Sequence, residues 1–124
     1  MLRDHDVAAT LAVTDMDAAR SFYEGTLGLE RVLEAPDGVV YSAGNSRLMV
    51  YRSDFAGTNR ATAATWAVGD ELESTVQDLR TKGVAFEHYD LPGTTRDGDI
   101  HEMGGMRGVW FKDPSGNIIG LVNQ

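Results

Sequence analysis

Residues 13–30 read VTDMDAARSFYEGTLGLE, and residues 68–85, VGDELESTVQDLRTKGVA, repeat the same pattern. In each copy a short apolar segment is followed by an acidic turn, an amphipathic run and a glycine. Three positions are identical at an offset of 55 residues: Val13 and Val68, Asp15 and Asp70, Gly28 and Gly83. An internal repeat of this kind indicates two similar structural units. The sequence therefore predicts two strand–helix–strand modules, with the function where they meet.

The first copy predicts a strand followed by a capped helix. Segment 7–13, VAATLAV, is short and apolar, as expected of a strand. Asp15 can accept backbone N–H bonds from the first turn of the next helix, and Gly28 favours its left-handed end. Between them lies an apolar stripe at helical spacing: Met16, Ala19, Phe22, Tyr23 and Leu27.

The second copy predicts the same elements. Asp70 is the expected cap and Gly83 the expected stop, and between them Leu72, Val76 and Leu79 form the apolar stripe. Strand patterns then flank turn-rich segments in both halves, at 29–33, 39–43, 47–52, 84–89, 109–112 and 118–122. A glycine-rich stretch at 90–108 is predicted as a long loop.

These patterns predict an α+β fold in which each half is a βαβββ module. We place the first module at 1–57 and the second at 58–124, within one domain, because 124 residues match the size of a single domain. The chain has no cysteine, which excludes disulfides and thiolate chemistry.

The composition also excludes some partners. The chain carries 11 basic and 19 acidic side chains, a net charge of −8, which disfavours nucleic acid and anionic membranes. No apolar run approaches the roughly 20 residues needed to span a bilayer. The opening segment, MLRDHDVAAT, lacks the features of a signal peptide, so we predict a cytoplasmic protein.

Three features carry a resemblance to a known family: the repeat, the segment FYEGTLGLE at 22–30, and the terminal hairpin VWFKDPSGNIIGLV at 109–122. Together they resemble the vicinal oxygen chelate superfamily. That group includes glyoxalase I, extradiol dioxygenases, methylmalonyl-CoA epimerase, fosfomycin resistance enzymes and bleomycin resistance proteins. The resemblance implies βαβββ modules whose mixed sheets curl into a cup, and a homodimer.

Most enzymes of that superfamily hold a divalent metal with His and Glu side chains. The resemblance places the four ligand positions at Ala8, Val50, Ala64 and Gly120, with Met49 and Ala63 as neighbours of uncertain register. None of the four side chains has a lone pair to donate, and a Lewis-acid metal needs several converging ligands. The resemblance therefore implies a protein without the usual metal, and we predict no cofactor.

The remaining candidates for chemistry are histidines. His101 lies in the predicted loop, where a lid could present it as an acid, a base or a hydrogen-bond donor. The competing interpretation is an exposed loop histidine. A metal held by His88, His101 and Glu102 would need the loop to fold back onto a strand. His5, near the start of the chain, is expected on the surface.

Aromatic and neighbouring side chains form the predicted ligand-binding set. The set is Thr10, Tyr41, Tyr51, Trp66, His101, Met103 and Trp110. Aromatic walls with few polar groups suit a planar, partly apolar ligand. The same tryptophans could instead plug a core or an interface. Arginines that could pair with an anionic group are Arg47, Arg52 and Arg107.

Two functions follow from this reading. The first is a metal-free binding protein that sequesters a small molecule, as bleomycin resistance proteins do, with a cationic or aromatic ligand. The second is an enzyme, either a glyoxalase-like lyase or isomerase using His101, or a dioxygenase with a non-standard metal site.

Overall fold

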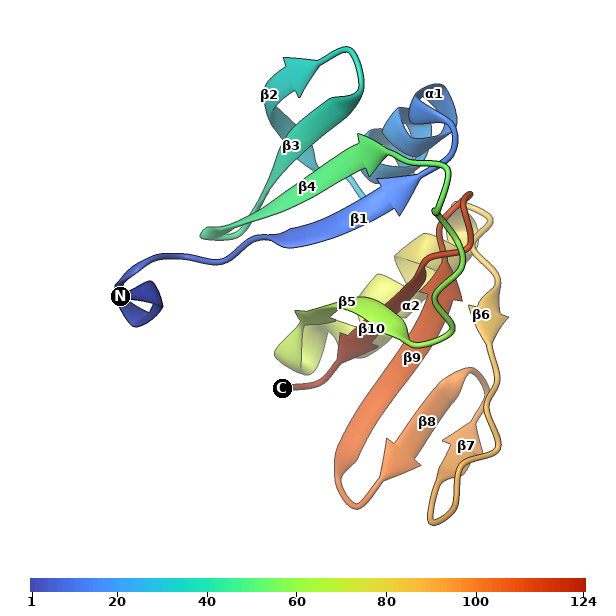
Figure 1. Cartoon of the computed structure of the whole chain (residues 1–124). Helices are drawn as coiled ribbons and strands as arrows, with labels where there is room; N and C mark the ends of the chain where they lie inside the picture. The colour runs from blue at the N-terminus through green and yellow to red at the C-terminus, as the bar shows by residue number, and fades with distance from the viewer. The chain divides into compact units, whose positions relative to one another are not determined.

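Each half of the chain builds its own unit of helix and sheet in the computed structural model, which describes residues Met1–Gln124 (Figure 1). The first unit comprises Met1–Arg60 together with Asp113–Asn117, and the second comprises Ala61–Lys112 together with Ile118–Gln124. The predicted α+β class, with a mixed sheet in each half, is confirmed. None of the helices has the length and apolar character needed to span a bilayer.

The first unit is a four-stranded sheet with one helical segment (Figure 1). Its strands lie in the order β1-β4-β3-β2, with β1 parallel to β4 and the other pairs antiparallel. The elements are η1 (Leu2–Asp4), β1 (Ala9–Val13), α1 (Met16–Arg20), η2 (Ser21–Thr26), β2 (Glu30–Ala35), β3 (Gly38–Ala43) and β4 (Ser46–Arg52). This is the predicted βαβββ order.

The helical segment begins as the sequence predicts. The Asp15 carboxylate accepts from the backbone N–H groups of Asp17 and Ala18 at 2.9 and 3.2 Å. After Arg20 the chain widens into the π-helical turn η2, and a glycine at φ +74°, Gly28, follows it. Of the predicted stripe, three residues are buried: Met16, Ala19 and Tyr23.

One face of the first sheet packs against this helical segment. The Tyr41 ring stacks on Tyr23 with centroids 6.0 Å apart, and its hydroxyl donates to Glu24 Oε2 at 2.9 Å. Strand register places Leu48 and Val50 beside Tyr41 on this face, and both are buried. We call the opposite side the Met49 face; it carries Thr10, Ala12, Leu33, Val40, Met49 and Tyr51.

The second unit has a larger sheet with a helix behind it (Figure 1). The strand order is β5-β10-β9-β8-β7, and β6 also pairs with β9. The elements are β5 (Thr62–Ala67), η3 (Gly69–Glu71), α2 (Leu72–Thr81), β6 (Phe86–Glu87), β7 (Thr95–Asp97), β8 (Ile100–Met103), β9 (Met106–Lys112) and β10 (Ile118–Val122). The predicted strand 84–89 is therefore only two residues long.

The predicted loop at 90–108 is wrong, because two strands and the start of a third lie within it. β7 is exposed along its whole length and consists of polar residues. It therefore lacks the alternation of apolar and polar residues by which a strand is recognised in a sequence. The tight turn between β8 and β9 is Gly104-Gly105, and both glycines have positive φ, +56° and +92°. A two-residue hairpin of this type requires that conformation, which explains the glycine pair.

Helix α2 confirms the predicted stripe but not the predicted cap. Leu72, Val76 and Leu79 are all buried. Asp70 was expected to cap the helix, but it lies inside the 3-10 turn η3 instead. Glu71 occupies the N-cap position and makes no side-chain bond there. The extra turn supplies backbone bonding at this end, since the Glu71 N–H donates to the Val68 carbonyl at 3.0 Å.

The DPSGN turn at 113–117 is held by a buried carboxylate in the first unit. Asp113 accepts from the Tyr23 hydroxyl at 2.7 Å and from the backbone N–H groups of Ser115 and Asn117, each at 2.9 Å. The Asn117 amide donates to Asp113 at 2.8 Å and to the Ala12 carbonyl at 2.7 Å. The turn is therefore tied both to the helical segment and to β1.

This network predicts a loss of stability in alkali. Burial, followed by the charge of Asp113 and the hydrogen bond to it, raises the pKa of Tyr23, and burial and Glu24 raise the pKa of Tyr41. Both phenols favour the folded state while protonated, so their contribution is complete below the unfolded-state pKa of about 10 and declines above it. We expect unfolding above about pH 10, followed by circular dichroism and by phenolate absorbance.

The substitution Tyr23→Phe supplies the control for this prediction. It removes one of the two titrating phenols, so the variant should lose less stability between about pH 10 and pH 12 than the parent does. Phenolate absorbance from Tyr23 that rises before the circular dichroism changes would contradict the assignment.

Candidate functional site

The second sheet brings together three of the predicted ligand-binding residues. Trp110 pairs with Gly120, and His101 pairs with Gly108, so the two side chains lie on the same face of the sheet. Met103 lies two residues beyond His101 on that face. We call it the Trp110 face; it carries Thr65, His101, Met103, Gly108, Trp110 and Gly120.

The other predicted residues lie elsewhere. Trp66 pairs with Leu121, and Leu121 pairs with Val109. Val109 directly precedes Trp110 on β9, so Val109 and Trp66 lie on the side of the second sheet opposite Trp110. In the first unit, Thr10 and Tyr51 share the Met49 face. Tyr41 lies on the helix-covered face of that sheet and is fully buried.

His101 is neither in a loop nor exposed, so the interpretation as an exposed loop histidine is wrong. It lies on β8 with 0 % of its surface exposed. Its Nε2 atom lies 3.0 Å from the backbone N of Tyr89 and accepts that N–H. A neutral imidazole that accepts at Nε2 carries its proton at Nδ1. Nδ1–H has no hydrogen-bond partner.

Two other aromatic rings lie against the His101 ring. The His101 centroid lies 4.8 Å from Trp110 and 6.3 Å from Tyr89, and the Tyr89 and Trp110 centroids lie 5.4 Å apart. The contacts of Trp110 with both other rings are edge-to-face, a favourable geometry for aromatic pairs. The Tyr89 hydroxyl is also buried without a partner.

The Trp110 indole occupies the space above Gly120. A Cβ atom built on Gly120 would lie 3.4 Å from Trp110 Nε1, and 3.3 Å from the Thr65 hydroxyl. The indole N–H in turn donates to the Thr62 hydroxyl at 3.1 Å. A Cβ at position 120 would touch the indole and lie close to the Thr65 hydroxyl, so glycine gives the tryptophan more room here.

The residues at the four implied metal positions do not fit a metal. Gly120 is on the Trp110 face, whereas Ala64 pairs with Ile119 on the opposite side of the second sheet. Val50 lies on the helix-covered face of the first sheet and is buried. Met49, the preceding residue of β4, therefore points to the other face. No group of three or more His, Cys, Asp and Glu side chains in the chain is arranged to hold a metal ion.

The set His88, His101 and Glu102 is not assembled either. Glu102 follows His101 directly on β8 and pairs with Arg107, so its side chain lies on the other face of the sheet. The predicted arginine candidates have other partners. Arg52 pairs with Asp54 and Arg107 with Glu73, each at 2.8 Å, and Arg47 donates to its neighbouring backbone carbonyl.

A charged cluster around Asp99 could not be recognised in the sequence. Asp99 accepts from Arg80 and His88, each at 2.7 Å, and Arg96 lies 2.8 Å from the other ring nitrogen of His88. Hydrogen bonds from Arg80 and then His88 lower the pKa of Asp99. The four residues come from α2, β7, the segment after β6 and the turn after β7, so no sequence spacing links them. The hydrogen bonds among these four residues connect the segments to one another.

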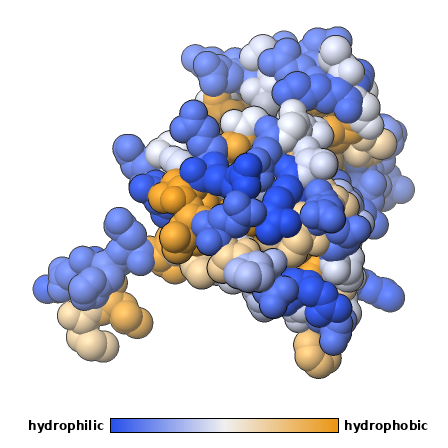
Figure 2. Space-filling model, turned by 90° about the horizontal axis from the view of Figure 1, so that it is seen from above, coloured by the Kyte–Doolittle hydropathy of each residue, from blue (hydrophilic) through white to orange (hydrophobic).

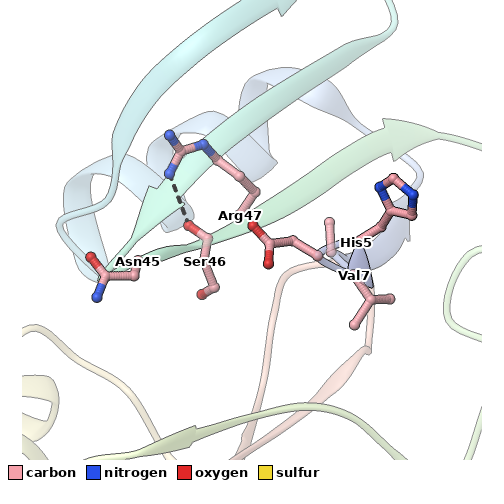
Figure 3. A pocket seen from close by; sticks show the side chains of 7 residues that line it. His5, Val7, Asn45, Ser46 and Arg47 are labelled. Atoms are coloured by element: carbon pink, nitrogen blue, oxygen red, sulfur yellow. Dashed lines mark hydrogen bonds between the residues drawn. The ribbon is translucent and has the colours of Figure 1, made fainter. Parts of the chain in front are cut away.

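The first unit has an open hollow beside its N-terminal arm (Figure 3). Its volume is about 490 Å³, and its walls are the arm residues 5–8 and the hairpin tip at Asn45, Ser46 and Arg47. His5 lies here at the surface, as predicted. The turn η1 that precedes it stands away from the sheet, with the apolar side chains of Met1 and Leu2 exposed (Figures 1 and 2).

Comparison with known proteins shows which family has this fold. A family model described as Glyoxalase/Bleomycin resistance protein/Dioxygenase superfamily matches residues 5–121. No curated protein matches the chain. Among solved structures, the bleomycin resistance determinant encoded on transposon Tn5 is similar, with a TM-score of 0.74 and 17 % identity over 97 % of this chain and 98 % of that one.

Two further structures show the same fold. Lactoylglutathione lyase from Agrobacterium tumefaciens has a TM-score of 0.73 and 20 % identity, over 98 % of this chain and 95 % of that one. TnmS3, an antibiotic binding protein from Streptomyces sp. CB03234, has a TM-score of 0.68 and 21 % identity, over 98 % and 96 %. These identities establish a shared fold, and the relatives include both enzymes and binding proteins.

Proposed function

We propose a function from one premise: this chain belongs to the Glyoxalase/Bleomycin resistance protein/Dioxygenase superfamily. The function is binding of a small organic molecule without a metal and without catalysis, in the manner of antibiotic-sequestering resistance proteins. The Trp110 face of the second sheet is the proposed binding surface. The ligand is sequestered there and kept from its target.

One observation carries this proposal: an indole lies where the resemblance places a metal-binding carboxylate. Gly120 leaves room for Trp110, and the indole nitrogen is engaged by Thr62. An aromatic surface backed by small residues favours a flat organic molecule over a hydrated cation. The net charge of −8 suits a cationic or neutral ligand better than an anionic one.

The alternative function is a lyase or isomerase in which His101 moves protons. The hydrogen bonding of this residue favours binding instead. Its only basic nitrogen, Nε2, is already engaged by the Tyr89 N–H, so taking up a proton would break that bond. Nδ1–H remains free to donate a hydrogen bond, which is what ligand recognition requires. A dioxygenase would also need metal ligands, and the implied positions do not supply them.

The expected assembly is a homodimer. The Met49 face leaves apolar side chains exposed, with Leu33 at 66 %, Met49 at 44 % and Tyr51 at 45 %. Burial of such a surface against a second copy would remove it from water. Sedimentation equilibrium tests this expectation, and a monomer at micromolar concentration would contradict it. A cytoplasmic location remains a prediction of the sequence.

A thermal-shift screen of metal-stripped protein tests the proposed function. Bleomycin and fosfomycin enter the screen because similar folds carry those names, beside uncharged aromatic compounds. A specific ligand at 100 times its Kd should add about 2.7 kcal/mol to the free energy of unfolding. Conversion of the hemithioacetal of methylglyoxal and glutathione to S-lactoylglutathione, with or without added Zn²⁺ or Ni²⁺, would support the enzyme alternative and contradict the proposal.

A further inference from the structure

Two buried polar atoms of the second unit lack any partner, and both belong to the ring cluster on the second sheet. They are Nδ1 of His101 and the hydroxyl oxygen of Tyr89. Folded proteins leave few such atoms unpaired, because each unpaired group gives up its hydrogen bonds to water without replacement. An unpaired pair in one cluster therefore points to a function rather than to packing.

The two atoms differ in what they can bond. The Tyr89 N–H fixes the His101 tautomer, so Nδ1–H is a donor only, and the ring is uncharged. The Tyr89 hydroxyl can donate or accept. Burial, followed by the charge of Glu87, raises the pKa of Tyr89, so the hydroxyl keeps its proton at neutral pH. Each of the two groups can therefore donate one hydrogen bond to an acceptor.

The other polar atoms of the cluster are already engaged. Nε2 of His101 accepts from the backbone, and Nε1 of Trp110 donates to Thr62 at 3.1 Å. The remaining surface consists of the faces and edges of the three rings, whose centroids lie 4.8 to 6.3 Å apart. Such a site offers stacking to a flat apolar body and hydrogen bonds to a ligand acceptor.

Resting on the proposed function, we infer that the ligand is an uncharged aromatic compound with a carbonyl oxygen, held by His101 Nδ1–H and the Tyr89 hydroxyl. An anionic carboxylate is disfavoured, because Glu87 lies on the same face as Trp110 and Lys112, a cation of that face, already pairs with Glu87 at 3.5 Å. A cation is disfavoured because His101 Nδ1–H can only donate a hydrogen bond, whereas a cation needs an acceptor. Tyr89 and Trp110 are half-buried, whereas His101 is buried. A ligand therefore reaches His101 by displacing the rings of Tyr89 and Trp110.

A matched pair of probes tests this inference. Acetophenone and ethylbenzene have the same ring and nearly the same size, but only acetophenone carries an acceptor. In a titration followed by ¹⁵N NMR, we expect acetophenone to bind about tenfold more tightly and to shift the His101 Nδ1–H resonance. Equal affinities would overturn this inference and leave the proposed function standing. If neither probe gives saturable shifts at millimolar concentration, this inference is wrong, and the thermal-shift screen decides the proposed function separately.

The variant Tyr89→Phe separates ligand recognition from structure. The hydroxyl has no partner in the fold, so its removal should leave the melting temperature unchanged or raise it. The preference for acetophenone over ethylbenzene should fall several-fold. The control is Phe55→Leu, since Phe55 is an exposed aromatic residue of the first unit with no assigned role, and its replacement should alter neither property. A lower melting temperature with an unchanged preference in Tyr89→Phe would show a structural role and overturn the inference.

Discussion

Replacing Asp113 with alanine should lower the free energy of unfolding by about 4 kcal/mol, the largest stability effect we expect from a single substitution. The carboxylate is 5 % exposed and accepts from four donors on Tyr23, Ser115 and Asn117. Alanine would leave the Tyr23 hydroxyl and the turn's N–H groups without their acceptor, and buried unpaired donors are costly. Urea denaturation followed by circular dichroism measures the effect.

The matched control for this substitution is Asp90→Ala. Asp90 is an exposed aspartate outside any helix or strand, so its replacement should change stability by less than about 0.5 kcal/mol. Tyr23→Phe removes one bond of the network and should cost about 1 kcal/mol. A midpoint for Asp113→Ala as high as that of Asp90→Ala would show that the carboxylate does not hold the turn.

The second large effect concerns the two tryptophans. Trp110→Ala should weaken acetophenone binding by about 30-fold, because a tryptophan at the centre of a binding surface typically contributes 2 kcal/mol or more. Trp66 serves as the matched control, since register places it on the opposite side of the same sheet. Trp66→Ala should leave the affinity within about twofold of the parent.

The indole N–H resonances give the same test without a substitution. The chain has two tryptophans, so a ¹⁵N spectrum contains two indole signals. The Trp110 signal should move on addition of acetophenone, and the Trp66 signal should stay in place. Movement of the Trp66 signal alone would place the ligand on the opposite side of the second sheet and contradict the proposed surface.

The repeat carried enough information to predict the fold class, because its signals are local. An aspartate cap, an apolar stripe and a glycine stop act within one helix, and in the first copy all three are present. The second copy shows the limit of this reasoning. Asp70 has the same position in the repeat as Asp15, yet a 3-10 turn moves it away from the cap.

The strands within 90–108 escaped prediction for a different reason. β7 is a polar, exposed edge strand, so it lacks the alternation by which strands are recognised. Its pairing with β8 depends on a turn at Gly98 and Asp99 and on hydrogen bonds to residues farther along the chain. Because these strands were not predicted, nothing in the local pattern indicated that His101 lies in the interior.

The faces of the strands were the least predictable part of the site. A shift of one residue moves a strand side chain to the other face of its sheet. This is why Val50 lies in the core while Met49 lies on the opposite face, and why Trp66 and Trp110 are separated by the second sheet. The Tyr89 N–H that fixes His101 comes from 12 residues earlier, which no local pattern reveals.

The most direct test of metal-free binding is a titration of EDTA-treated, ¹⁵N-labelled protein with acetophenone, repeated after addition of Zn²⁺. We predict saturable shifts of the Trp110 indole N–H and the Tyr89 amide, with the same Kd in both titrations. Shifts that occur only when Zn²⁺ is present would contradict this account.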